Sequence, residues 1–182
     1  MSTLDIIYVT VMLAVLFVVL MNEYYSWRLK VVPGPSMPWA RKKMVEALQK
    51  HAPAGGPQRI MEPGSGWGGL ARAASRAFPD AQVEGYELSL FPFLFSLTGT
   101  RKHLRFYKRD FTQADWNRYD TILCYLTKQL MSDLSAVWAE KLPPGALVIS
   151  NAQPLPGWTE IDRIKTAIGG VETPPIYVYR KD

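Results

Sequence analysis

The longest apolar segment of the chain lies near its amino end, between Ile6 and Met21. Tyr8 and Thr10 are its only mildly polar positions, and a single acid, Asp5, precedes it. A helix needs about 17 to 25 mainly apolar residues to cross a bilayer, so the segment is just long enough for one crossing. The pattern predicts a membrane-spanning helix within an N-terminal anchor of residues 1–30.

A cleaved signal peptide is an alternative interpretation of this segment. Signal peptides carry basic residues before the apolar run and a small-x-small cleavage site after it. Here Asp5 comes before the run, and Asn22-Glu23-Tyr24-Tyr25 comes after it. The sequence therefore favours an uncleaved anchor, and a buried apolar helix is the remaining alternative.

Aromatic and basic residues follow the apolar segment. Aromatic side chains are frequent at the membrane–water interface, and positive charge marks the cytoplasmic side of a span. The aromatic residues are Tyr24, Tyr25 and Trp27, and the basic ones are Arg28, Lys30, Arg41, Lys42 and Lys43. We expect a single-pass membrane protein whose main domain lies on the cytoplasmic, or matrix-equivalent, side.

The hydrophobic pattern changes after residue 30. Residues 31–38 are too rich in proline for a helix and predict an extended linker. Apolar residues at helical spacing then predict a helix from Pro38 to about Lys50, with Ser36 as its N-cap.

Short apolar runs alternate with helical segments through residues 39–182, which we expect to form one domain. The predicted helices include Leu70–Ala77 and Ser132–Lys141, and the predicted strands are a run ending at Glu62, Val83–Glu87, Leu104–Lys108, Thr121–Tyr125, Ala146–Ser150, Trp158–Ile164 and Ile176–Tyr179. Alternation of this kind is typical of a parallel sheet covered by helices on both faces. The expected fold is α/β, with a doubly wound, mostly parallel sheet.

Composition narrows the possible functions. The formal net charge of +5 fits an acidic partner or an anionic membrane face and is too small to indicate nucleic acid. The single cysteine, Cys124, lies in an apolar run and is predicted to be buried and inert. His51 and His103 belong to no Ser–His–Asp set and no metal-ligand spacing, so we expect neither a hydrolase nor a metal site.

The chemical signal lies between Arg59 and Leu70, where an apolar run ends in Glu62 and a glycine-rich turn follows. Glycines let the backbone turn sharply and approach a ligand closely. The turn contains Gly64, Gly66, Gly68 and Gly69, and three of these also match the G-x-G-x-x-G fingerprint of dinucleotide-binding proteins.

Charge distinguishes the two kinds of ligand. A dinucleotide would place a pyrophosphate opposite the carboxylate of Glu62, which is unfavourable. S-adenosylmethionine has no phosphate, and its sulfonium and ammonium groups favour that carboxylate. Two more strand-like runs end near acids: Glu87 is suited to the ribose hydroxyls, and Asp110 with Phe111 is suited to the adenine amino group and ring. The pattern favours S-adenosylmethionine.

Three motifs carry a resemblance to the class I S-adenosylmethionine-dependent methyltransferases: E-P-G-S-G-W-G at 62–68, Y-E-L at 86–88 and R-D-F at 109–111. V-P-G-P at 32–35 and G-Y-E-L at 85–88 are similar to motifs of the small membrane-associated protein-lysine methyltransferases, the type that acts on the c-ring protein of mitochondrial ATP synthase or on adenine nucleotide translocase. That group often has V-P-Q-M-M after strand four, whereas residues 126–131 read L-T-K-Q-L-M and lack the proline. The resemblance implies a seven-stranded Rossmann-like fold and a lysine of a membrane protein as substrate.

The candidate site residues follow from these motifs. Trp67 either covers the methionine end of the cofactor or packs against a helix. On the acceptor side we expect Tyr125 and Gln129, because ligands of open parallel sheets bind beyond the carboxyl ends of the strands. A core tyrosine and an ordinary helix N-terminal residue are the alternatives for these two. The cofactor-binding candidates are Glu62, Gly64, Ser65, Gly66, Trp67, Gly68, Glu87, Leu88, Asp110 and Phe111.

Two other functions fit the same residues. A membrane-anchored methyltransferase acting on a lipid or quinone would use the same cofactor. A module that binds the nucleotide without catalysis would share the loop, and the three acids at strand ends disfavour it. The oligomeric state stays open.

Overall fold

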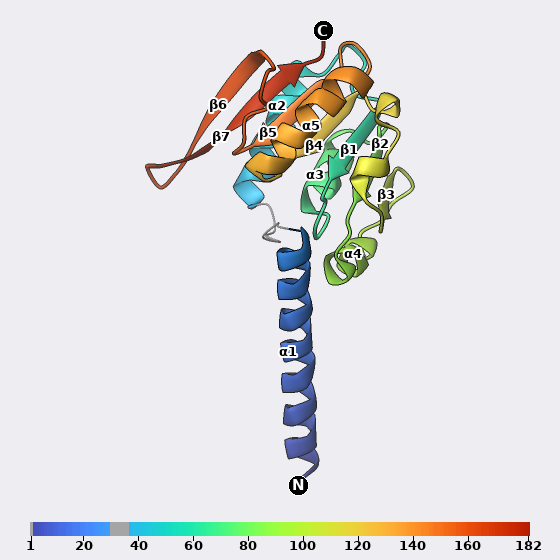
Figure 1. Ribbon diagram of the computed structural model, residues 1–182, viewed down its shortest axis with the longest axis vertical. Helices are drawn as coiled ribbons and strands as arrows, with labels where there is room; N and C mark the ends of the chain where they lie inside the picture. The colour runs from blue at the N-terminus through green and yellow to red at the C-terminus, as the bar shows by residue number, and fades with distance from the viewer. Residues whose placement is uncertain (1, 30–36) are drawn as a thin grey trace. The chain divides into compact units, whose positions relative to one another are not determined.

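The computed structural model describes residues 2–29 and 37–182, and the chain divides into two compact units, Met1–Gly34 and Pro35–Asp182 (Figure 1). The predicted linker at 31–38 lies mostly outside the described residues, as does Ser36. Met37 is the N-cap of the following helix and forms no side-chain cap, so the predicted N-cap at Ser36 is wrong.

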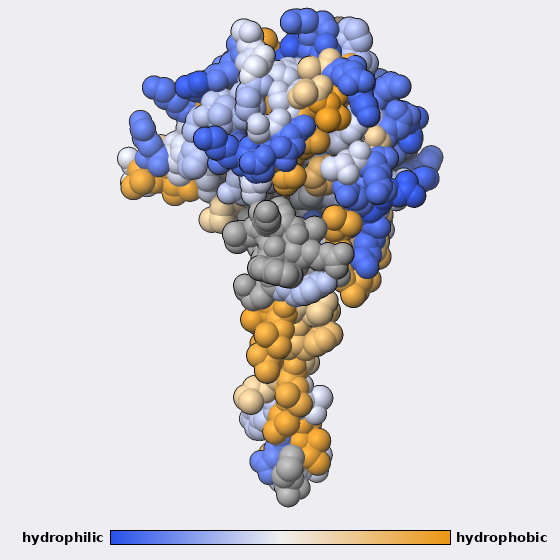
Figure 2. Space-filling model, in the orientation of Figure 1, coloured by the Kyte–Doolittle hydropathy of each residue, from blue (hydrophilic) through white to orange (hydrophobic). Residues whose placement is uncertain are grey.

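The first unit contains helix α1 (Thr3–Leu29). Its segment Thr3–Met21 is long and apolar enough to cross a membrane and is not buried by other residues, and Figure 2 shows its apolar surface. Ser2 and Asp5 cap its start reciprocally: the Ser2 N–H donates to Asp5 Oδ2 at 2.7 Å, and the Asp5 N–H donates to Ser2 Oγ at 3.2 Å. The lone acid before the apolar run therefore has a structural role. The side chains of Tyr25 and Trp27, part of the predicted aromatic belt, lie outside the described residues.

The second unit is built on a seven-stranded sheet of order β3-β2-β1-β4-β5-β7-β6 (Figure 1). Strands β1 to β5 are parallel, and β7 is antiparallel to both of its neighbours, β5 and β6. The strands are β1 (Arg59–Pro63), β2 (Gln82–Tyr86), β3 (Leu104–Tyr107), β4 (Thr121–Cys124), β5 (Leu147–Asn151), β6 (Glu160–Ile168) and β7 (Val171–Arg180). The predicted doubly wound, mostly parallel sheet is confirmed.

Helices cover both faces of this sheet because successive strand residues are apolar in both directions. Ile60 and Met61 are neighbours on β1 and are both fully buried, yet they belong to opposite cores. One core lies under α2 (Pro38–His51), α3 (Gly69–Ala77) and α4 (Leu90–Leu97), and the other lies under α5 (Lys128–Lys141) and the short 3-10 helices η1 (Phe111–Gln113) and η2 (Trp116–Arg118). Continuous apolar runs are expected for a sheet buried on both faces.

Local capping explains where the observed elements differ from the predicted ones. Helix α5 begins at Lys128, four residues before the predicted Ser132, because Thr127 caps it by accepting the Leu130 N–H at 3.4 Å. The two tail strands form a long hairpin whose turn is Gly169-Gly170, with φ angles of +56° and +82°. Cys124 is fully buried as predicted, and burial raises the pKa of its thiol to about 12.

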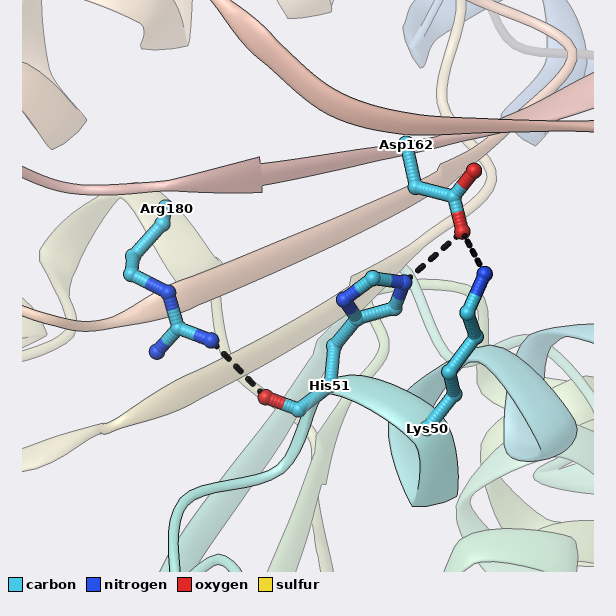
Figure 3. A network of polar contacts seen from close by, with 4 residues as sticks. All are labelled: Lys50, His51, Asp162 and Arg180. Atoms are coloured by element: carbon cyan, nitrogen blue, oxygen red, sulfur yellow. Dashed lines mark hydrogen bonds and ion pairs between the residues drawn. The ribbon is translucent and has the colours of Figure 1, made fainter.

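A polar network fixes the end of α2 to the hairpin (Figure 3). Lys50 Nζ and His51 Nε2 both contact Asp162 Oδ2, at 2.7 and 2.8 Å, and Arg180 Nη2 donates to the carbonyl of His51 at 2.9 Å. Asp162 lies near the start of β6 and Arg180 ends β7, opposite the start of β5. Helix α2 therefore ends at the edge where the parallel strands begin, which we call the amino edge.

We expect the variant Asp162→Asn to lower stability above pH 4 and to match the wild type near pH 2. The hydrogen bond from Lys50, followed by that from His51, lowers the pKa of Asp162 from 3.8 to about 2. A lowered pKa stabilises the fold above the unfolded-state value, and that contribution is lost as pH falls from about 4 toward 2. Partly exposed ion pairs contribute about 0.2–1 kcal/mol, which corresponds to about 1–3 °C in melting temperature for a chain of this size.

Thermal unfolding of the detergent-solubilised chain between pH 2 and 8 measures this difference. Glu140→Gln, an exposed acid on α5, is the control. A difference between wild type and Asp162→Asn that persists unchanged at pH 2 contradicts the assignment.

Candidate functional site

The glycine turn between β1 and α3 lies at the edge where the parallel strands end, which we call the carboxyl edge. Gly64, Gly66 and Gly68 have φ angles of +67°, +51° and +74°, so all three occupy the left-handed region that favours glycine. Gly68 has a second constraint, because a β-carbon there would lie 2.6 Å from Phe106 Cζ. The turn thus has a backbone shape that side chains at these positions would disrupt.

Glu62 lies near the end of β1 in a buried position, 6% exposed. One of its oxygens, Oε2, accepts the Ala71 N–H at 2.8 Å, which connects the strand to the first turn of α3. Burial raises the pKa of Glu62 to about 8, and the hydrogen bond from Ala71 opposes that rise. The nearby Glu87 raises this pKa further, so a cationic ligand would favour ionisation here.

Glu87 follows β2 directly and is 9% exposed. Its Oε2 accepts the Gly66 N–H at 2.8 Å, and its Oε1 accepts the Ser89 N–H at 2.6 Å. A carboxylate has about four acceptor positions, so both oxygens keep capacity for further donors such as hydroxyl groups. Glu87 therefore fixes the middle of the glycine turn and can still bind a ligand.

Ser65 and Trp67 occupy the turn between the glycines. The Ser65 N–H donates to the Tyr86 carbonyl at 2.8 Å, while its buried Oγ has no hydrogen-bond partner among the described residues. The Trp67 ring meets the Phe95 ring edge-on, with centroids 5.2 Å apart. Of the two alternatives for Trp67, the contact with α4 is thus the one the structure describes. Leu88, next to Glu87, is partly exposed.

Asp110 and Phe111 follow β3. Asp110 caps η1 through Oδ1, which accepts from the Thr112 N–H at 2.9 Å and from its hydroxyl at 2.8 Å. Its Oδ2 takes no hydrogen bond within the described part of the chain. Phe111 is partly buried against the core under α5. An acceptor oxygen and an aromatic ring thus lie side by side in sequence at the end of a third strand.

The two acceptor-side candidates lie after β4. Tyr125 is 49% exposed, so it is not a core tyrosine. Gln129 is on the exposed face of α5, where its Nε2 donates to Asp133 Oδ1 at 2.8 Å. The structure brings the glycine turn, Glu87, Asp110 and Tyr125 to one edge of the sheet, while the side chain of Gln129 pairs within its own helix.

Asn151 is a site residue that the sequence analysis did not identify. It ends β5, is 5% exposed, and its Oδ1 has no partner among the described residues. The pairing of Cys124 with Ser150 puts Asn151 beside Tyr125 at the carboxyl edge. The next residue, Ala152, has a φ of +70°, which is unusual for a residue with a β-carbon. A polar residue ending a fifth apolar run is the signal that was available in the sequence.

The residues at this edge fit S-adenosylmethionine. A β-carbon at Gly66 would meet nothing within 4 Å, so the turn opens onto space where a ligand can approach the backbone. The buried Ser65 Oγ is available to a polar group, and acids end or follow β1, β2 and β3. These features match the hydroxyls, the adenine and the positive charges of that cofactor.

Comparison with known proteins agrees with this geometry. A family model described as the ANTKMT methyltransferase domain matches residues 62–162. The lysine N-methyltransferase of the ATP synthase c-ring protein from Xenopus laevis is 27% identical over 127 residues, which are 67% of this chain and 55% of that protein. The chain thus spans about half the length of this curated relative.

Solved structures show the same fold at low sequence identity. An RNA methyltransferase from Salinibacter ruber, in complex with S-adenosyl-L-homocysteine, has a TM-score of 0.68 and 19% identity, covering 81% of this chain and 93% of that one. TrmN from Thermus thermophilus has a TM-score of 0.59 and 21% identity, covering 82% of this chain and 50% of that one.

We expect Glu87→Ala to weaken binding of S-adenosylmethionine about ten- to hundredfold, because hydrogen bonds to a charged group contribute about 1.5–3 kcal/mol. Calorimetric titration measures the change, and Glu140→Ala on the exposed side of α5 is the matched control. Unchanged binding in Glu87→Ala, or tight binding of NAD by the wild type, would contradict the proposed role.

Cofactor affinity should rise with pH up to about 8 and then level off. With a pKa of about 8, Glu62 is mainly protonated at neutral pH, and a cationic ligand binds its ionised form better. Binding then releases a proton, and affinity increases by at most about tenfold per pH unit below that pKa.

Titration of wild type and Glu62→Gln in parallel isolates this effect, since the amine of the ligand titrates identically in both experiments. The variant should bind weakly and lose the extra pH dependence. Identical pH profiles for the two proteins would exclude Glu62 as the titrating group.

Proposed function

The chain belongs to the family of the ANTKMT methyltransferase domain and is a class I S-adenosylmethionine-dependent methyltransferase; from this premise we propose that it methylates a lysine of a membrane protein. The observation that carries the proposal is the convergence of the glycine turn and three strand-end acids beside an exposed Tyr125. The similarity to the Xenopus laevis lysine N-methyltransferase supports lysine as the acceptor.

The proposed cofactor contacts follow from the acceptor oxygens described above. Glu87 binds the ribose hydroxyls, Asp110 and Phe111 bind the adenine, and Glu62 with the glycine turn attracts the charged methionine end. The cofactor supplies a methyl group on a positively charged sulfur. Displacement at such a carbon depends mainly on positioning and on excluding water, so it needs no metal and no strong base.

Tyr125 and Asn151 are the proposed acceptor-side residues. The hydroxyl of Tyr125 and the buried Oδ1 of Asn151 are both oxygen acceptors, and the strand register puts the two residues beside each other. An amine that has lost its proton to solvent can donate its remaining hydrogens to these oxygens, which directs its lone pair. Gln129 stays a weaker proposal, because it would first have to leave Asp133.

Membrane location is the second part of the proposal. The span at Thr3–Met21 is unburied, begins with a reciprocal cap and is followed by basic residues, which supports a single crossing with the domain on the cytoplasmic, or matrix-equivalent, side. An anchor keeps the domain near embedded targets and raises their effective concentration.

Incubation of the full chain with methyl-labelled cofactor and a membrane extract tests the substrate class. We expect label in protein, and mass analysis should find added methyl groups on lysine. Glu87→Ala is the matched inactive control. Label that extracts into organic solvent would instead support a lipid or quinone acceptor, and an absence of turnover would support a non-catalytic module.

A further inference from the structure

Exposed apolar side chains of the methyltransferase domain gather at two places. Helix α4 exposes Leu94, Phe95 and Leu97, at 48%, 52% and 39%. The tip of the β6–β7 hairpin exposes Ile168 and Val171, at 46% and 69%. Figure 2 shows apolar surface at both places, over α4 and at the hairpin tip. Side chains of this size seldom cluster on a water-facing surface without a partner.

Both places lie at the carboxyl edge of the sheet, beside the site. Helix α4 follows Glu87 at the end of β2, and its Phe95 contacts Trp67 of the glycine turn. Strand β6 is antiparallel to β7, which is antiparallel to β5, so β6 runs in the direction of β5. The hairpin tip after Ile168 is therefore at the same edge, on the far side of the sheet from α4 (Figure 1).

The first helix of the domain also starts toward this edge. The network of Lys50, His51, Asp162 and Arg180 holds the last turn of α2 at the amino edge. Helix α2 has 14 residues and is about 21 Å long, so its first turn lies toward the carboxyl edge. Met37, which directly precedes this turn, is 56% exposed. The domain therefore begins on the side of the site.

Basic residues accompany these apolar groups. Lys108 and Arg109 follow β3, Lys128 follows β4, and Lys42 lies near the start of α2, and all four side chains are exposed. Among the described residues from 37 onward, Ile161 at the start of β6 is the large exposed apolar side chain that lies at the opposite edge. Apolar groups combined with positive charge are typical of surfaces that bind anionic lipid.

We propose that the domain docks onto an anionic bilayer surface through its carboxyl edge, with α4 and the β6–β7 tip inserted among the headgroups. The site then faces the membrane, and a lysine close to the lipid surface reaches Tyr125 without leaving the bilayer. This inference rests on the proposed membrane location and deepens it, because a span alone would tether the domain without orienting it.

Single-cysteine variants of the full chain test the orientation. I168C and I161C are a matched pair on one strand, at the carboxyl and amino edges, and L94C reports on α4. The native Cys124 is fully buried and its thiol pKa is raised to about 12, so it does not react with the label. Each variant carries an environment-sensitive fluorophore and is reconstituted into phosphatidylglycerol-containing vesicles with and without brominated lipid.

We expect blue-shifted emission and quenching by brominated lipid at positions 168 and 94, and neither at 161. Equal, solvent-like emission at all three positions overturns docking even if lysine methylation is observed. Emission at 168 and 94 that responds to added tRNA and not to the lipid overturns it as well, and would make the edge a nucleic-acid surface. Because this readout needs no turnover, docking and the proposed lysine activity can fail independently.

Substitutions at the hairpin tip test the functional consequence. We expect I168S combined with V171S to lower the methylation rate of membrane-embedded acceptor about tenfold, the scale of losing a buried apolar side chain, while leaving the rate on a short soluble lysine peptide unchanged. I161S is the matched control and should change neither rate. Equal rates on membranes for I168S/V171S and I161S overturn the proposal.

Discussion

Two buried carboxylates hold the backbone on which the site depends. Glu87 accepts N–H groups from the glycine turn and from the residues after β2, and Glu62 accepts one from the first turn of α3. Each carboxylate thus connects a strand end to the turn that must face the ligand. Burying a charged group is unfavourable without compensation, and the raised pKa of Glu62 reflects that cost. A ligand with positive charge relieves it, so the constraint that shapes the turn also selects what binds there.

The same fold occurs in RNA methyltransferases at low identity, which shows that the sheet carries the cofactor half of the chemistry and leaves the acceptor open. What distinguishes this chain lies around the sheet. The connection from β5 to β6, described throughout, contains no helix, so Asn151 and the residues after it stand directly at the carboxyl edge. The candidate span precedes α2, and α4 adds exposed apolar surface on the other side of the glycine turn. Acceptor choice therefore depends on features outside the cofactor-binding strands.

Much of the fold could be predicted because its signals are local. Alternating apolar runs gave the strands within one or two residues in most cases, and the spacing from the glycine turn to Glu87 gave the contact between them. Partner choices between side chains could not be predicted in this way. Gln129 bonds to Asp133 instead of facing the site, and Trp67 meets Phe95, because both depend on how helices are placed on the sheet. The start of α5 was missed because Thr127 caps it, and Asn151 was missed because a polar strand end has many uses.

The network at the end of α2 also decides where mechanical load is carried. Helix α2 is the first element of the domain, and its far end is held by Asp162 and Arg180 of the antiparallel hairpin. A pull on the amino end of this helix is transmitted along its axis into those two strands, which take no part in the glycine turn. Thermal rocking of an anchored helix in a fluid bilayer would thus be absorbed at the β6–β7 side of the sheet. The turn between β1 and α3, where small displacements matter most, is mechanically shielded from the tether that keeps the enzyme in place.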